Sequence, residues 1–183
     1  THSKRDYAKR LFLFALISEI PYLLAMGYFQ LNVIFTFLIC FCILLLLDSR
    51  LNKIQKILSV LGLIFLSTLC DCALILPIAT ILFKFSRGNR KKQIQAWIIM
   101  CAVFFVLNVP GYAPVDAPYP FLSGYALLHG FYAIISWILA GIVIQVFYNG
   151  KKSEKYVFFN KWLFYFYYPV HLLVLWSIRF FLL

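Results

Sequence analysis

The chain has 183 residues, of which 64% are hydrophobic and 13% charged, and its formal net charge is +11. A soluble domain is about half apolar and a quarter charged, so this composition excludes a soluble globular domain. It predicts an all-α membrane protein that has the lipid bilayer as its solvent. The cations fall in short clusters between apolar runs, which marks them as loop charges and disfavours a nucleic-acid-binding surface.

Seven apolar runs approach the length that a membrane crossing requires, about 20 residues or about 17 at the short end. In chain order they are residues 11–28, 31–47, 54–70, 72–85, 94–109, 121–147 and 157–183. The third and fourth runs are short and form a close hairpin around Asp71, so the count depends most on them. We therefore expect a polytopic helical bundle with about seven crossings, forming a single transmembrane domain over residues 1–183.

The positive charge lies on one side of this expected bundle. With the N-terminus inside, sixteen of the 17 Lys and Arg residues fall on the inner face, and Arg179 alone falls on the outer one. The inner loops are residues 48–56, 84–93 and 148–156. This segregation agrees with the positive-inside rule and predicts a cytoplasmic N-terminus.

Two ionisable residues lie deep inside predicted crossings, Glu19 and His171. Glu19 is nine residues after Arg10 and His171 is ten after Lys161, which places both about 13 to 15 Å from the same membrane face. Such groups cost at least ~2.5–3.5 kcal/mol in a bilayer. Either His171 removes a proton while Glu19 sets its charge, or a buried Glu–His or Glu–Tyr hydrogen bond fixes the helix packing.

Three other polar residues are candidates for an acceptor pocket or for plain structural roles. Asp71 and His129 map toward the outer side, where an acceptor pocket and an ordinary interfacial position both suit them. Asn32 lies four residues before Thr36 on one helical face, so both side chains could hydrogen-bond a neighbouring helix. The five cysteines lack the spacing of a zinc site, and no metal is predicted.

The basic inner face offers a second kind of candidate. Its clustered cations could attract an anionic cosubstrate such as a nucleotide-bearing thioester, or the acidic headgroups of the inner leaflet. The residues of interest there are Arg90, Lys91, Asn149 and Lys151.

Several segments, in this order along the chain, resemble the TraX family, which is named for the conjugative-pilin acetylase. They are YAKRLFLFALISEIP at residues 7–21, LNVIFT at 31–36, YNG at 148–150 and FYFYYPVHLL at 164–173. Members of that family usually begin with one or two further helices that contain an Asp-His pair. Nothing here matches those helices, so we expect this chain to lack them.

The resemblance implies an acetyltransferase of the bacterial inner membrane that moves an acetyl group from acetyl-coenzyme A to an amine or hydroxyl. The acceptor would be a pilin-like protein or another cell-envelope component. It strengthens His171 and Glu19 as catalytic candidates. We expect acceptor contacts from Asp71, Asn32, His129 and Tyr168, and donor contacts from Asn149, Lys151, Arg90 and Lys91.

Two other functions compete with acetyl transfer. The aromatic segment at residues 156–168 suits packing against a partner helix, as in a non-catalytic subunit of a secretion, pilus or transport assembly. Binding of coenzyme A would separate these two hypotheses. A transporter is disfavoured because the chain shows neither paired gating acids nor inverted repeats.

Overall fold

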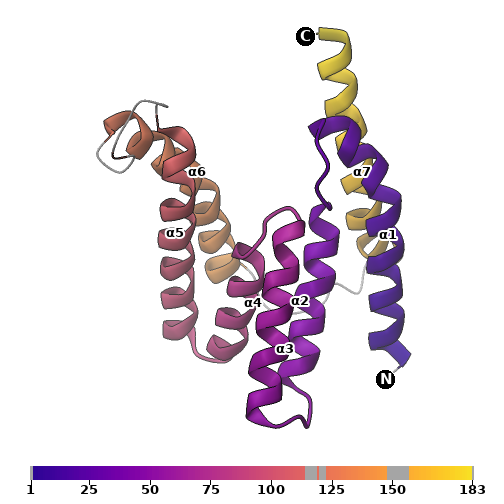
Figure 1. The fold of residues 1–183 in the computed structure, drawn as a ribbon, viewed down its shortest axis with the longest axis vertical. Coiled ribbons are helices and arrows are strands. Elements are labelled where there is room, and N and C mark those ends of the chain that lie inside the picture. Colours follow the sequence, from indigo (N-terminus) through magenta and orange to yellow (C-terminus); the bar gives the residue numbers. More distant parts are fainter. Residues whose placement is uncertain (1, 114–118, 120–122, 148–156, 183) are drawn as a thin grey trace. The chain divides into compact units, whose positions relative to one another are not determined.

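The computed structural model describes residues 2–113, 119, 123–147 and 157–182, and this part of the chain is helical without a β-strand (Figure 1). The all-α prediction is confirmed. The α-helices are α1 (His2–Met26), α2 (Val33–Leu47), α3 (Lys53–Leu66), α4 (Ile75–Ser86), α5 (Arg90–Tyr112), α6 (Gly124–Ile142) and α7 (Val157–Leu182). A short 3₁₀ turn, η1 (Ser67–Leu69), follows α3, and a π-helical turn, η3 (Val143–Phe147), ends α6.

The number of membrane crossings differs from the prediction. Within the described residues, three helical segments are long and apolar enough to cross a membrane, fewer than the seven expected. They are Arg90–Tyr112, Gly124–Phe147 and Trp162–Phe181. Helix α3 has 14 residues, or about 21 Å, against a hydrocarbon core of about 30 Å. Helices α2 and α4 are apolar but also short. Helix α1 is long, yet it carries Lys9, Arg10 and Glu19.

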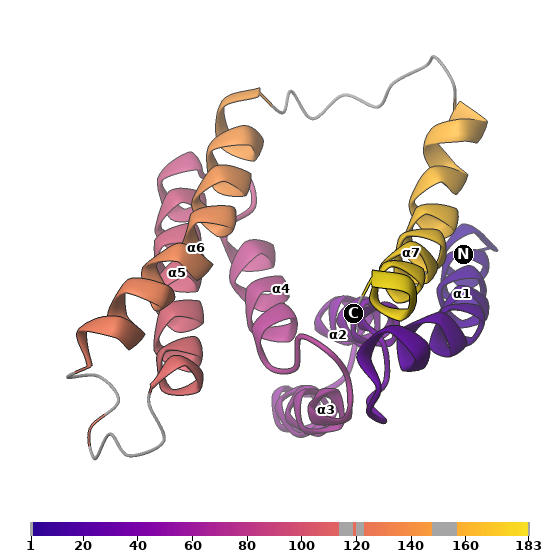
Figure 2. The same cartoon turned by 90° about the horizontal axis from the view of Figure 1, so that it is seen from above.

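The chain divides into two compact units, residues 1–80 with 152–183 and residues 81–151. In the first unit, α1 packs against both α2 and α7, and α2 packs against α3 (Figure 2). Its buried core comprises Leu11, Phe14, Ala15, Ile34 and Tyr165. The rings of Phe14 and Tyr165 stack with centroids 4.8 Å apart, which joins α1 to α7 near the middle of both helices.

In the second unit, α5 and α6 pack side by side and run antiparallel. Trp97 contacts Trp137 and Phe105 contacts Phe131, with ring centroids 5.9 and 5.0 Å apart. Residues later in α5 therefore contact residues earlier in α6, as in an antiparallel pair. Gly130 lets the two backbones approach closely, as small residues do at helix interfaces in membranes.

Replacing Gly130 with alanine should therefore destabilise the second unit. A Cβ atom at this position would lie 2.6 Å from Cγ2 of Val109 and 2.9 Å from a ring carbon of Phe105. Val109 is β-branched and fully buried, so it has little room to move. We expect a loss of about 1–3 kcal/mol, measured by thermal unfolding of the protein in detergent.

Gly124→Ala is the matched control, because it changes the same helix at a position with no atom within 4 Å of the added Cβ. Equal unfolding temperatures for both variants would show that the close approach at Gly130 does not limit the packing of α5 on α6.

Candidate functional site

The connection between α1 and α2 fixes the geometry of a polar cluster in the first unit. The chain leaves α1 at Gly27, whose φ of +78° suits glycine, and then bends at Tyr28 before it reaches Leu31. The Leu31 N–H donates to the Leu69 carbonyl at 3.1 Å, and the Asp71 N–H donates to the Leu31 carbonyl at 2.7 Å. These bonds hold the turn at Asp71 beside the start of α2.

Glu19 of α1 meets the N-terminus of α2 through Asn32. Its Oε2 accepts hydrogen bonds from the Asn32 side-chain Nδ2 at 2.7 Å and from the Asn32 backbone N–H at 3.2 Å. Its Oε1 is buried and has no hydrogen-bond partner in the described part of the chain. The N-terminal end of a helix carries partial positive charge, which complements a carboxylate. One carboxylate oxygen is thus held firmly, and the other is buried and unpaired among the described residues.

Asn32 is fully buried and uses its whole side chain in this arrangement. Its Oδ1 caps α2 by accepting from the Ile34 N–H at 3.0 Å, while its Nδ2 also donates to the Ala15 carbonyl at 2.7 Å. The same amide therefore starts one helix and orients the carboxylate of another.

Tyr168 of α7 brings a hydroxyl to the same end of α2. The Val33 backbone hydrogen-bonds this hydroxyl, and the carboxylates of Glu19 and Asp71 lie close enough to influence it electrostatically. Thr36 is also fully buried and donates its hydroxyl to the Asp71 carbonyl at 2.5 Å. The structure thus brings together four predicted site residues, Glu19, Asn32, Asp71 and Tyr168.

Of the hydrogen bonds that the sequence left open for Glu19, one to His171 does not occur among the described residues. Glu19 bonds Asn32, while the His171 Nδ1 lies 3.2 Å from the Tyr167 carbonyl. A carbonyl only accepts, so Nδ1 is the donor in this contact. The His171 ring contacts that of Tyr168 edge-on at 5.3 Å, so Tyr168 connects His171 to the Glu19 cluster.

The turn that carries Asp71 has an unusual backbone. Cys72 and Leu74 adopt positive φ angles of 55° and 62°, which non-glycine residues rarely do outside constrained sites. Loss of solvation, followed by the nearby charge of Asp71, raises the pKa of Cys72 to about 11. The thiol is therefore protonated at neutral pH and is poorly suited to act as a nucleophile.

The remaining predicted site residues lie elsewhere. His129 belongs to the second unit, where its Nδ1 lies 2.9 Å from the Tyr125 carbonyl. Arg90 and Lys91 are exposed at the start of α5. Asn149 and Lys151 lie outside the described residues. No group of three potential metal ligands occurs in the part of the chain that the structure describes.

Two buried polar residues of α1 escaped the sequence-based selection, Ser18 and Tyr22. Their exposed fractions are 0% and 1%, and they lie next to Glu19 on the helix. Their spacing could have identified them, because residues four apart share one helical face and Ser18 and Tyr22 are four residues apart. They extend the polar cluster along α1.

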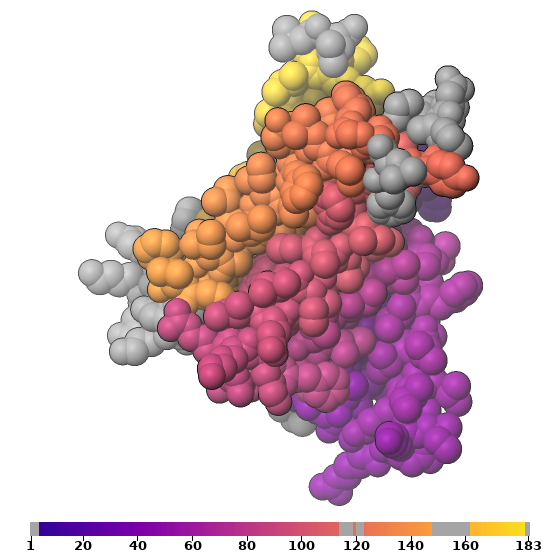
Figure 3. Space-filling view, turned by 90° about the vertical axis from the view of Figure 1, so that its left-hand side faces the viewer, coloured from indigo at the N-terminus to yellow at the C-terminus, as the bar shows by residue number. Residues whose placement is uncertain are grey.

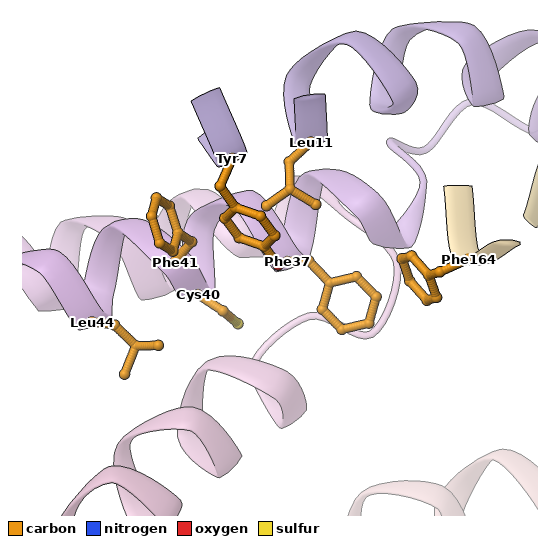
Figure 4. Close-up of a pocket in the computed structure, with 7 residues that line it drawn as sticks. All are labelled: Tyr7, Leu11, Phe37, Cys40, Phe41, Leu44 and Phe164. Carbon is orange, nitrogen blue, oxygen red and sulfur yellow. The ribbon is translucent and has the colours of Figure 1, made fainter. Parts of the chain in front are cut away.

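An apolar pocket of about 390 Å³ lies farther along the same three helices (Figure 4). It is lined by Tyr7, Leu11, Phe37, Cys40, Phe41, Leu44 and Phe164. Leu11 precedes Glu19 by eight residues, about 12 Å along α1. Among the described residues, no charged side chain lines the pocket.

Comparison with known proteins gives one family and one relative. A family model described as TraX protein matches residues 1–179, which includes every residue of the polar cluster. A probable fimbrial assembly protein, FimC of serogroup H1 from Dichelobacter nodosus, is 28% identical over 151 residues, or 82% of this chain. The chain spans 57% of the length of that relative. No solved structure matches.

Proposed function

The chain belongs to the TraX family, and from this membership we propose that it transfers an acetyl group from acetyl-coenzyme A to an amine or hydroxyl. The acceptor is a pilin-like protein or another cell-envelope component, and the protein lies in the bacterial inner membrane with a cytoplasmic N-terminus. One observation carries the proposal: Glu19 has one oxygen held by Asn32 and a buried Oε1 without a partner. This is the geometry of an oriented general base.

In the proposed reaction, Glu19 Oε1 takes the proton from the acceptor N–H or O–H as that atom attacks the thioester carbonyl. The Val33 N–H donates to the Tyr168 oxygen, which leaves the phenol hydrogen free to donate to the oxyanion that develops. The tetrahedral intermediate then collapses, the carbon–sulfur bond breaks and the coenzyme A thiolate departs. His171 orients the Tyr168 ring.

The direct test is transfer of isotopically labelled acetyl from acetyl-coenzyme A in membranes that contain the full-length protein and purified pilin. Mass spectrometry of the intact pilin measures acetylation, and a thiol reagent measures coenzyme A release for any acceptor. Label in pilin or in another envelope fraction, with matching thiol release, supports the proposal. Absence of both signals contradicts it.

His171→Ala should slow transfer about tenfold, because the Tyr168 ring would lose the side chain that orients it. A tenfold loss of rate corresponds to a rise of roughly 1.4 kcal/mol in the activation free energy. Ser177→Ala is a suitable control, because Ser177 also lies on α7 and bonds the carbonyl four residues earlier, at 2.8 Å. Its rate should equal that of the unchanged protein. A His171→Ala rate equal to that of the control would remove His171 from the mechanism.

A non-catalytic subunit of a pilus assembly is the second candidate. The relative described as a fimbrial assembly protein favours it, as do the exposed aromatic side chains of Phe164, Phe166 and Tyr167 on α7. In that case, pilus components would copurify with the protein and labelled acetyl-coenzyme A would remain unconsumed.

A further inference from the structure

A long apolar groove lies between α5 and α6 in the second unit, and the two helices run side by side in Figure 3. Its volume is about 430 Å³. It is lined by Arg90, Ile94, Trp97, Ile98, Cys101, Trp137, Ile138, Gly141, Ile142, Gln145 and Val146. Both helices are long and apolar enough to cross a membrane.

The floor and rims of the groove are well defined. Gly141 forms the floor of the groove and lets the Trp97 ring pack against it, since a Cβ at this position would lie 3.3 Å from that ring. The rims carry outward-facing side chains: Ile98 is 63% exposed and Ile142 is 49% exposed. The groove therefore opens sideways from the helix pair, toward the lipid that surrounds a membrane-spanning segment.

Arg90 gives the groove a charged end. It is the first residue of α5, is exposed, and makes no hydrogen bond or ion pair with any residue that the structure describes. Because α5 and α6 are antiparallel, Gln145 in the π-helical turn η3 lies at this end as well. From Arg90 to Cys101 the groove follows eleven residues of α5, about 16 Å. One leaflet of hydrocarbon is about 15 Å deep.

From this match of length, apolar lining and terminal charge, we infer that the groove binds an anionic phospholipid. One acyl chain lies against Trp97 and Trp137, and the phosphate is held by the Arg90 guanidinium with Gln145 beside it. The pantetheine arm of coenzyme A fits less well, because its amides would meet an almost wholly apolar lining. This assigns Arg90 to lipid instead of the acetyl donor, and it is independent of the proposed acetyl transfer.

The test uses phosphatidylglycerol that carries bromine on one acyl chain, with brominated phosphatidylcholine as the neutral comparison. The full chain is reconstituted in phosphatidylcholine vesicles as the double variant Trp162→Phe and Trp176→Phe. Trp97 and Trp137 in the groove are then the only tryptophans of the chain. Bromine quenches tryptophan on contact. One cation favours an anionic lipid about fivefold. Brominated phosphatidylglycerol should therefore reach a given degree of quenching at about one fifth of the mole fraction that brominated phosphatidylcholine requires.

Arg90→Gln should remove the fivefold preference, whereas Lys91→Gln should keep it, because Lys91 carries the same charge outside the groove lining. Gly141→Leu should weaken quenching by both lipids, since its side chain would fill the groove. Equal loss of preference in Arg90→Gln and Lys91→Gln would show only diffuse surface attraction and would overturn the inference. Displacement of the lipid by coenzyme A would overturn it in favour of a donor site.

Discussion

Glu19→Gln is expected to reduce acetyl transfer by about 10²- to 10⁴-fold, the usual contribution of a positioned general base. Glutamine has nearly the same shape, and its carbonyl oxygen can still accept the two hydrogen bonds from Asn32. The substitution thus removes the ability of Oε1 to take a proton and keeps the contact between α1 and α2. Loss of activity without loss of fold is the expected result.

The rate is measured as coenzyme A release and as labelled acetyl in the acceptor, and the fold by the unfolding temperature in detergent. Asp6→Asn is the matched control, because Asp6 is an exposed carboxylate on the same helix. It should leave both measurements unchanged. Activity of Glu19→Gln at the control rate would rule out Glu19 as the base.

The sequence identified Glu19, Asn32, Asp71 and Tyr168 in the polar cluster, but it missed Ser18 and Tyr22 and could not give the contacts. Glu19 and Asn32 were each selected, one for its depth and the other for its helical spacing. Their hydrogen bond depends on how α2 packs against α1, and the connection from Gly27 to Leu31 sets that packing. That connection is held by the Leu31 bonds to Leu69 and Asp71, forty residues away in sequence and without a local pattern.

The depth of His171 along α7 does not determine its neighbours, for a similar reason. Counting residues from the membrane face gives a position along the helix axis, but the neighbour of a side chain also depends on rotation about that axis. Tyr168, one turn earlier on α7, reaches the start of α2, and His171 packs against Tyr168. The sequence could not show that His171 packs against Tyr168, which reaches the start of α2.

The excess of predicted crossings comes from counting apolar residues without regard to helix ends. The predicted run at residues 54–70 includes η1 and Cys70, which lie outside α3. The next predicted run begins at Cys72, but α4 starts only at Ile75, after the turn with positive φ angles. The turn at residues 70–74 contains one polar residue, Asp71, and neither glycine nor proline, so hydropathy extends the predicted helices up to both sides of Asp71.

Asn32→Ala should destabilise the protein by about 2–4 kcal/mol. The N-cap of α2 contributes about 1 kcal/mol, and loss of the donors to Glu19 and Ala15 leaves two buried acceptors poorly satisfied, at about 1–3 kcal/mol. Acetyl transfer should fall as well, because Glu19 would lose the side chain that orients it. The unfolding free energy in detergent and the transfer rate together measure these effects.

Asn52→Ala separates capping from the special role of Asn32. Asn52 caps α3 in the same way, accepting from the Gln55 N–H at 2.8 Å, but it is exposed and contacts no catalytic candidate. Asn52→Ala should lower the free energy of unfolding only by the capping contribution, about 1 kcal/mol, and should leave the transfer rate unchanged. A double-mutant cycle of Asn32→Ala with Glu19→Gln should then show a coupling of about 0.5–3 kcal/mol. Additive effects, or equal losses for Asn32→Ala and Asn52→Ala, would mean that Asn32 acts only as a helix cap and that another group orients Glu19.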